Sequence, residues 1–366
     1  ESRRLDRAAR GRAQMRTHKG IPISNLYYML AYAFEFVDKS KLIDVGTDDF
    51  DNALDLLAFL LETGIASQVK HGLYKEYVSK MEELLTVRGK IDMLPTARSR
   101  FARKQTISCE FHELSENNLM NQILKTTCLL LVRSDDVDRS RRDAIKKTML
   151  YFSEVEPIPL RSVDWARIDF TRSNRSYRFL LSICQLIAEG MLIDDSKGGF
   201  VLAPYIDEGT LNRLFEKFVL RYYKVHHPEL SSSSPKIAWA LDEEYSGTML
   251  PTMQTDIALS NAGRFLIIDA KFYASSLLSQ ERYGTKRVHS GNLYQIFSYV
   301  KNKASSSPEL EVLGMLLYAR TREAVQPNER FLMDGNEIHV RTLDLAGQFG
   351  DISSELEDIA ALMGSK

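Results

Sequence analysis

Apolar residues recur every three or four positions along much of the first half of the chain, which is the spacing of amphipathic helices. This pattern predicts a helix over 25–34 with Ser24 as its cap, and a second helix over 51–63 that Gly64 would end. Three further segments follow the same spacing, over 118–133, 139–152 and 177–193.

The segment from Tyr77 to Glu113 has a different pattern. Its apolar runs are shorter, and Arg88-Gly89-Lys90 and Pro95 interrupt them, which favours strands and turns. The first half is therefore expected to hold a small β unit flanked by helices.

The second half alternates helices with strands. A helix is predicted over 209–223, where Leu211, Leu214 and Phe218 share one face. Strands are predicted over 237–241, 256–259, 265–270, 312–319 and 338–342, with a helix over 292–301 between the third and the fourth. This order is typical of a mixed α/β sheet layered by helices, so the fold class is α/β here and α+β over the whole chain.

Charged residues gather at one end of a predicted hairpin in the second half. Asp256 opens the strand before the turn at 261–263, and Asp269 and Lys271 close the strand after it. The start of one antiparallel strand lies opposite the end of the next, so the two acids can converge, while residues 269 and 271 share a face. Two carboxylates and a backbone carbonyl such as that of Ala270 are ligands that suit Mg²⁺. A lysine beside them can hold a water molecule or offset charge on a phosphate.

A purely structural interpretation of these residues is an Asp269–Lys271 ion pair, which leaves Asp256 unexplained. The apolar run Ile267-Ile268 before the acid favours function, because charges in a buried strand are costly without a task. Glu216 lies among apolar residues of the helix over 209–223. It is either a further metal ligand or a solvated surface residue.

Two features after the hairpin fit the same site. Gln295 and Tyr299 stand four residues apart, on one face of the next predicted helix, where they can orient catalytic groups or contact DNA. The alternative is that Gln295 simply caps a neighbour. Arg282, Lys286 and Arg287 offer a cationic loop for a phosphate backbone, or else an ordinary solvated surface.

Composition narrows the class of protein. The chain has 366 residues, of which 44% are hydrophobic and 27% charged, as in a soluble globular protein of about two domains. Its 48 Lys and Arg balance 49 Asp and Glu, which excludes a protein that coats nucleic acid without specificity. Any DNA contact must therefore come from local patches. Arginines at several positions before Lys19 predict a flexible basic arm over 1–20.

The sequence lacks several motifs that mark other classes of protein. Three cysteines without a CxxC pair argue against disulfides and zinc and fit a cytoplasmic protein, with Cys128 and Cys184 expected in the core. The sequence has no run of 18 apolar residues, so no membrane association is expected. It also lacks GxxxxGK[ST], HExxH and GxSxG, which disfavours a P-loop nucleotidase, a metalloprotease and a serine hydrolase.

These residues resemble the PD-(D/E)XK nuclease superfamily. Within it they resemble the McrC family, the nuclease subunits of McrBC modification-dependent restriction systems. The most specific match is Thr255-Asp256-Ile257 with Asp269-Ala270-Lys271. Similarity extends from about Ile21 to the last helix, and includes the helix opening at 25–30, the turn at 88–92, and Asn292-Leu293-Tyr294-Gln295 with Tyr299.

The resemblance implies a restriction-endonuclease-like mixed sheet over 171–366 that cleaves double-stranded DNA with Mg²⁺. Asp256, Asp269 and Lys271 would be its catalytic set, with Glu216 as a further acid. It also implies that residues 21–170 dock on a separate McrB-like AAA+ GTPase hexamer and stimulate it. That partner would bind GTP and read the modified cytosine, and complexes would pair to cut both strands.

Two other functions stay open at this point. One is a mainly non-catalytic adaptor of an AAA+ motor, which the large aromatic-rich first half favours. The other is a nuclease of a different defence or repair system that shares the hairpin and does not use McrB. The resemblance says nothing about the basic arm.

Overall fold

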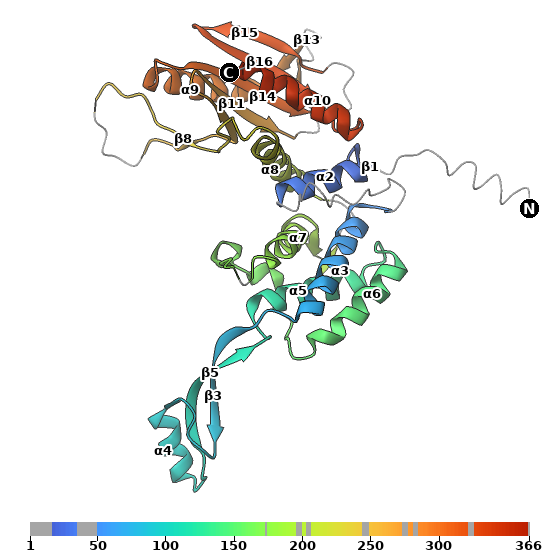
Figure 1. Cartoon of the computed structure of the whole chain (residues 1–366), viewed down its shortest axis with the longest axis vertical. Helices are drawn as coiled ribbons and strands as arrows, with labels where there is room; N and C mark the ends of the chain where they lie inside the picture. The colour runs from blue at the N-terminus through green and yellow to red at the C-terminus, as the bar shows by residue number, and fades with distance from the viewer. Residues whose placement is uncertain are drawn as a thin grey trace, which may run out of the picture. The chain divides into compact units, whose positions relative to one another are not determined.

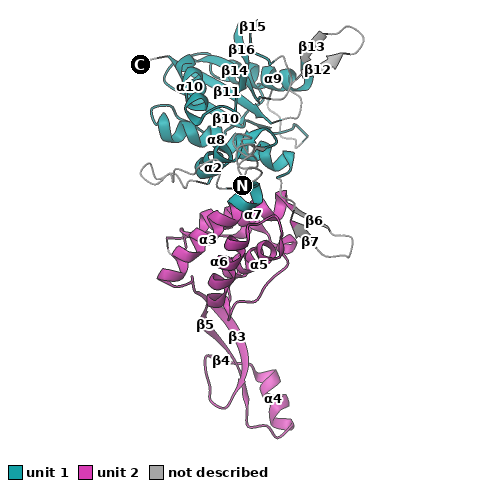
Figure 2. Ribbon diagram, turned by 90° about the vertical axis from the view of Figure 1, so that its right-hand side faces the viewer, with its two compact units in different colours: residues 1–56, 204–366 teal, residues 57–203 magenta. Residues whose placement is uncertain are grey.

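Figure 1 shows the computed structural model of the chain. The residues that it describes are 17–34, 50–172, 174–194, 200–202, 206–243, 249–272, 277–280, 285–320 and 326–364. The chain divides into two compact units, of which unit 1 combines 1–56 with 204–366 and unit 2 is 57–203 (Figure 2). Among the described residues, no helix has the length and apolar character needed to cross a membrane.

This division differs from the predicted boundary at 170/171. Helix α2 (Ile23–Ala33) belongs with the C-terminal half because it packs on α8 (Glu208–His226). The buried side chain of Asn25 holds it there, donating to the carbonyl oxygens of Leu345 at 2.8 Å and Gly347 at 2.7 Å. The local hydrophobic pattern does not report contacts between residues some 320 positions apart. The sequence-based prediction therefore grouped α2 with the segments that follow it in the chain.

Unit 1 is built on a sheet of strand order β10-β11-β14-β16-β15. Strand β11 (Arg264–Lys271) runs antiparallel to β10 (Ile257–Ser260) and parallel to β14 (Glu311–Ala319). Strand β16 (Asn336–Leu343) is parallel to β14, and β15 (Glu329–Met333) lies antiparallel beside it at the edge. The predicted mixed α/β class is confirmed. The edge strand β15 was not predicted, because its sequence Glu-Arg-Phe-Leu-Met is short and shows no alternation of polar and apolar residues.

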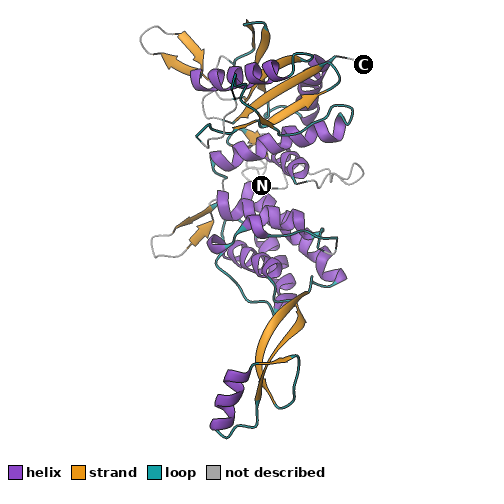
Figure 3. Ribbon diagram, turned by 90° about the vertical axis from the view of Figure 1, so that its left-hand side faces the viewer, coloured by secondary structure: helices purple, strands orange, loops and turns teal. Residues whose placement is uncertain are grey.

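Helices cover this sheet (Figure 3). Helix α9 (Ser290–Ser306) precedes β14 in the chain and packs Ile296 and Val300 in one cluster with Ile267 of β11. Side chains that point the other way, such as that of Ile268, are also fully buried. Helices α8 and α10 (Phe349–Ala360) contact the strands as well. Burial of both faces explains why the central strands read as continuous apolar runs.

The helices of unit 2 are α3 (Ala53–His71), which begins in unit 1, α5 (Leu119–Arg133), α6 (Arg139–Met149) and α7 (Tyr177–Gly190). The predicted end of α3 at Gly64 was wrong. A Cβ atom on Gly64 would lie 2.3 Å from Cδ2 of Leu180, so this glycine allows α7 to approach closely and does not stop the helix. Cys128 and Cys184 are buried between these helices, as predicted.

A projection of unit 2 spans residues 76–115 and is called the finger below. It consists of β3 (Glu76–Leu84), β5 (Ile107–Ser115), β4 (Lys90–Ile91) and α4 (Met93–Phe101), in the strand order β3-β5-β4. Figure 2 shows it extending away from the helices of unit 2, with α4 near its end. The small β unit is therefore confirmed, but helix α4 was missed because Pro95 suggested a turn. Pro95 instead sits in the first turn of the helix, where its missing N–H is tolerated.

Shorter elements complete the chain. The remaining strands are β1 (Thr17–His18), β2 (Ile21–Pro22), β6 (Leu192–Asp194), β7 (Phe200–Leu202), β8 (Lys236–Ile237), β9 (Met253–Gln254), β12 (Leu277–Gln280) and β13 (Thr285–Val288). Single 3₁₀ turns cover Leu150–Phe152, Leu160–Ser162, Trp165–Arg167 and Ala361–Met363.

These elements correct three expectations. The strand expected over 237–241 is shorter and begins one residue earlier, and Ser24 lies inside α2, whose N-cap is Pro22 without a side-chain cap. Of the arm expected over 1–20, residues 1–16 lie outside the described residues, whereas Thr17 and His18 already pair with β2.

Candidate active site

The hairpin brings the two predicted aspartates together. In the register of β10 and β11, Ile257 pairs with Ile268, so Asp256 at the start of one strand faces Asp269 near the end of the other. The backbone N–H of Ala270 donates to Asp256 Oδ2 at 3.0 Å, which fixes the carboxylate at the edge of β11. The predicted convergence of Asp256 and Asp269 is therefore present in the structure.

Lys271 contacts both acids. Its Nζ lies 2.9 Å from Asp269 Oδ1 and 3.6 Å from Asp256 Oδ2, and its side chain is 13% exposed. The Asp269–Lys271 ion pair that was the structural alternative thus exists, but it includes Asp256 as well. Three ionisable side chains meet at the end of a buried strand, which is more than an isolated pair requires.

The surroundings of Asp269 disfavour its charged form. Burial, with the nearby charge of Asp256 adding to it and Lys271 opposing it, raises the pKa of Asp269 to about 7. Its Oδ2 is buried and accepts no hydrogen bond from any described residue. A buried carboxylate oxygen without a partner is costly, and a cation placed between the two aspartates would satisfy it.

Glu216 faces the same site from α8. Its pKa rises to about 7, first because of burial and then because of the charge on Asp256, with Lys271 acting in the opposite direction. Glu216 is half-buried and its carboxylate accepts from Asn212, so it is not a fully solvated surface residue. The role of Glu216 as a further metal ligand stays a prediction.

Asn212 is a member of the site that sequence reasoning missed. Its side-chain N–H group donates to Glu216 Oε1, and its Oδ1 accepts a hydrogen bond of 2.7 Å from the backbone N–H of Phe272. One side chain thus connects the helix acid to the residue that follows Lys271. The sequence did contain a sign of this contact, because residues 212 and 216 are four positions apart and therefore lie on one face of the helix.

These groups fit a hard divalent cation. Asp256, Asp269 and the carbonyl of Ala270 offer oxygen ligands, with Glu216 close by, and Mg²⁺ commonly binds through one or two carboxylates while keeping several waters. No cluster of three or more His, Cys, Asp or Glu side chains within metal-binding reach occurs among the described residues. The oxygen donors at the end of β11 are thus two carboxylates and one backbone carbonyl, a set that a partly hydrated Mg²⁺ accepts.

Helix α9 brings a second polar group near β14. Gln295 Nε2 donates to Tyr299 Oη at 3.1 Å, so the predicted pair does share a helix face. Asn292 Nδ2 donates to the hydroxyl of Tyr318 at 2.9 Å, and Tyr318 is the residue of β14 that pairs with Lys271. The role of Gln295 and Tyr299 in orienting catalytic groups stays a prediction.

Little of the predicted cationic loop belongs to the described residues. Arg282 falls outside the described residues, while Lys286 and Arg287 belong to the backbone of β13. The DNA contact expected of these three residues is therefore still a prediction.

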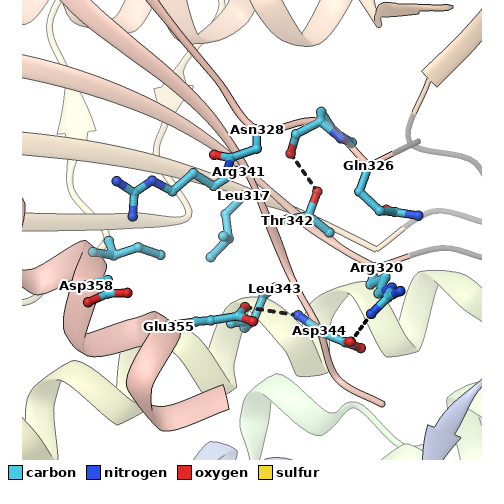
Figure 4. A pocket seen from close by; sticks show the side chains of 12 residues that line it. Leu317, Arg320, Gln326, Asn328, Arg341, Thr342, Leu343, Asp344, Glu355 and Asp358 are labelled. Atoms are coloured by element: carbon cyan, nitrogen blue, oxygen red, sulfur yellow. Dashed lines mark hydrogen bonds and ion pairs between the residues drawn. The ribbon is translucent and has the colours of Figure 1, made fainter. Parts of the chain in front are cut away.

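A cleft of about 570 Å³ opens beside β14 and β16 (Figure 4). Leu317 and Arg341 of the strands and Glu355 and Asp358 of α10 line it. Leu317 pairs with Ala270, so by strand alternation its side chain shares the face of Ala270 and not that of Asp269. This cleft is consequently separate from the acid–lysine site.

The fold and the site define a mixed α/β protein whose central sheet gathers two aspartates and a lysine at the end of one strand. A family model described as "McrBC 5-methylcytosine restriction system component" matches residues 10–319, and the chain belongs to this family.

Two relatives extend the comparison. The chain is 26% identical over 342 residues to the "Type IV methyl-directed restriction enzyme EcoKMcrBC" of Escherichia coli (strain K12), covering 93% of this chain and 97% of that protein. It is also similar in fold to a chain of the half-complex from a tetradecameric assembly of Thermococcus gammatolerans McrB AAA+ hexamers with bound McrC. That similarity has a TM-score of 0.51 at 22% identity and covers 92% of this chain and 76% of the other. The predicted family is confirmed.

Proposed function

We propose that this chain is the DNA-cleaving subunit of a restriction system directed at methylcytosine-containing DNA, and that it is a Mg²⁺-dependent endodeoxyribonuclease of the PD-(D/E)XK type. The observation that carries the proposal is the meeting of Asp256, Asp269 and Lys271 at the end of β11, with one buried carboxylate oxygen unpaired. The similarity to a methyl-directed restriction enzyme supports it.

Each side chain has a distinct task in this proposal. Asp256, Asp269 and the carbonyl of Ala270 would hold Mg²⁺, with Glu216 as a further acid. When bound, the ion supplies Lewis-acid stabilisation of the charge that develops on the phosphate. Lys271, held by both aspartates, orients a water molecule or balances charge on the phosphodiester.

A separate motor completes the proposed system. The solved relative contains McrB AAA+ hexamers with bound McrC, and this chain has no GxxxxGK[ST] sequence of its own. We therefore assign GTP binding and hydrolysis to a McrB-type partner and cleavage to this chain. Pairing of two such complexes would supply the two active sites that a double-strand break needs.

Cleavage of methylated plasmid by the chain with its partner GTPase, GTP and Mg²⁺ tests the proposal. Lys271→Ala and Asp269→Asn are expected to lower the cleavage rate by about 10²-fold or more, as loss of an electrostatic catalytic group does. Both variants should still stimulate the GTPase, which shows that they fold and bind. Lys301→Ala is the matched control, because Lys301 pairs with Asp334 away from the site. Normal cleavage by Lys271→Ala would refute the assignment.

The finger supports a second, docking function within residues 21–170. Its α4 exposes large apolar side chains, with Met93 at 74%, Leu94 at 75% and Phe101 at 91% exposure. A monomeric surface rarely displays such a group without a partner. We infer that the finger docks on the GTPase.

Serine substitutions in the full chain test the docking function. Met93→Ser, Leu94→Ser and Phe101→Ser combined are expected to abolish GTPase stimulation without lowering stability. The control is Leu150→Ser with Tyr151→Ser, which removes apolar groups that are 76% and 62% exposed elsewhere in unit 2. Full stimulation by the finger variant would disprove docking there and leave the nuclease assignment untouched.

A further inference from the structure

Unit 2 carries a concentration of arginines just before α7. Between residues 161 and 178 the sequence holds five arginines and two aspartates, in a chain whose charges otherwise balance. Three of them, Arg172, Arg175 and Arg178, are exposed and surround one turn. These three residues together with Phe170 are called the arginine turn below.

A buried asparagine gives the arginine turn a defined shape. Asn174 is 2% exposed, its Oδ1 accepts from the backbone N–H of Thr171 at 2.7 Å, and its Nδ2 donates to the carbonyl oxygen of Asp169 at 3.2 Å. Its own carbonyl oxygen accepts from the N–H of Tyr177 at 2.9 Å, which joins the turn to α7. The turn is thus held by hydrogen bonds on both sides and presents its arginines from a fixed base.

Tyr177 anchors the same base to the rest of unit 2. Its hydroxyl donates to Asn121 Oδ1 at 2.9 Å and accepts from the backbone N–H of Tyr74 at 2.9 Å. Arg178 N–H donates to the carbonyl oxygen of Arg175 at 3.1 Å, so these two arginines are adjacent along a helical turn. The guanidinium of Arg178 lies 5.9 Å from the ring centroid of Phe170, which is 39% exposed.

Two of the three arginines in the arginine turn keep their charge without an ion pair among the described residues. Of the two aspartates in the segment, Asp164 is paired with Arg167 at 3.1 Å, and the exposed Asp169 is the other. Arg172 and Arg175 form no ion pair with any residue that the structure describes. Arg172 and Arg175 therefore keep their positive charge at the surface of unit 2.

We propose that the arginine turn is a second DNA-contact surface, which binds the phosphate backbone of duplex DNA outside the active site. The inference rests on the proposed function in that it takes DNA as the substrate. Guanidinium groups present forked donors that match phosphate oxygens, and adjacent arginines on one turn can contact successive phosphates. Such a surface would also give a chain whose total charge is balanced a local patch that attracts the DNA backbone.

A phosphate backbone fits this surface better than a protein does. The central part of a protein interface is depleted of charge and rich in aromatic and apolar groups. The arginine turn has a single half-exposed aromatic ring among its cations, whereas the finger of the same unit is rich in exposed apolar side chains. The two surfaces of unit 2 thus differ in chemistry, and the arginine turn is the one with few exposed apolar groups among its cations.

Fluorescence anisotropy of a labelled 40-base-pair duplex with the full chain, in EDTA to prevent cleavage, tests the proposal. The test variant combines Arg172→Gln, Arg175→Gln and Arg178→Gln. The control combines Arg139→Gln, Lys146→Gln and Lys147→Gln, which removes the same charge from exposed positions of α6. Kd is measured at several salt concentrations, and circular dichroism verifies that both variants are folded.

The test variant is expected to raise Kd about tenfold or more and to reduce the slope of log K against log salt by about 2 to 3, because each phosphate contact contributes about 0.9 to that slope. The control is expected to bind like the unmodified chain. Equal weakening by both variants, unchanged binding by the test variant, or no duplex binding by the unmodified chain would overturn the proposal. So would loss of binding to the GTPase with DNA affinity retained, since the turn would then be a protein contact. The cleavage assay above judges the proposed nuclease function separately.

Discussion

The side-chain oxygen of Asn212 accepts a hydrogen bond of 2.7 Å from the backbone N–H of Phe272, the residue after Lys271. The same side chain donates to the carboxylate of Glu216. Asn212 therefore connects α8 to the end of β11 and sets the position of Glu216 relative to the two aspartates. The end of the hairpin is thus bonded to a side chain of α8 that lies 60 positions before Phe272 in the sequence.

Asn212→Ala is expected to slow plasmid cleavage about tenfold or more, because misplacement of catalytic groups by small distances is costly. The loss of stability should be about 1 to 2 kcal/mol, the usual cost of a partly buried hydrogen bond. Asn302→Ala is a matched control: Asn302 accepts from Ala240 N–H and donates to Ser298 O, away from the acids. If both variants cleave equally well, Asn212 has no positioning role.

The raised pKa of Glu216 predicts how stability depends on pH in the absence of metal. The group titrates near 4.5 in the unfolded chain and at about 7 in the folded one, so between these values the folded state binds the additional proton. In EDTA the free energy of unfolding is therefore expected to fall as pH rises from about 4.5 to 7, and the loss remains above pH 7. Glu216→Gln should remove about 1 kcal/mol of that loss after allowance for solvent screening.

Urea denaturation at pH 5 and pH 8 checks this expectation. Glu357→Gln provides a comparison, since this acid lies on α10 and contacts Tyr222 and His227. An identical pH dependence in the unmodified chain and in Glu216→Gln would show that Glu216 does not carry the effect.

A bound divalent metal ion should restore the stability that is lost when the two neighbouring aspartates ionise. Binding of Mg²⁺ or Ca²⁺ to ionised Asp256 and Asp269 stabilises only the folded state, by about 2.7 kcal/mol when the ion is at a hundred times its Kd. The melting temperature at pH 8 is expected to rise with added metal and to fall again with EDTA. Asp269→Asn should abolish the rise while leaving the metal-free melting temperature unchanged or higher, because an uncharged amide replaces the carboxylate whose buried Oδ2 has no hydrogen-bond partner among the described residues. A full metal-dependent rise in this variant would place the ion elsewhere.

The contact of Asn25 with two carbonyl groups makes the docking of α2 testable. Asn25→Ala leaves the carbonyl oxygens of Leu345 and Gly347 without these donors in a buried site, so we expect a loss of about 2 kcal/mol. Asn25→Asp should be worse, because an acceptor then faces two acceptors. Urea denaturation followed by tyrosine fluorescence measures both. Stability equal to that of the unmodified chain would mean that α2 is not held by this side chain.

Gly89 is expected to be essential for the finger. Its φ is +72°, and a Cβ atom would lie 2.4 Å from the carbonyl oxygen of Glu110 in β5. Gly89→Ala combines left-handed strain with a backbone clash, which should cost about 2 kcal/mol or more and reduce GTPase stimulation. Gly72→Ala is the control, since its φ is +85° with no atom within 4 Å. Unimpaired stimulation by Gly89→Ala would show that this turn does not shape the docking surface.

Local sequence patterns identified most of the elements and the centre of the site. Period-two alternation and a turn at 261–263 placed Asp256, Asp269 and Lys271 together, because hairpin geometry follows from neighbouring residues alone. The same reasoning failed at Gly64, where helix–helix packing outweighs the helix-breaking tendency of glycine, and at α4, where Pro95 suits the first turn. It also overlooked Asn212, whose role depends on a bond to a residue 60 positions away.

The sequence by itself therefore determined the hairpin that brings Asp256, Asp269 and Lys271 together, the mixed α/β class and the family, since each depends on short-range spacing and residue type. Only the tertiary structure decided that α2 belongs with the C-terminal unit, that Glu216 faces the aspartates, and that Asn174 shapes the arginine turn. The physical reason is that burial, desolvation and hydrogen bonds between distant segments depend on how the chain packs, and packing joins residues whose local patterns are independent of one another.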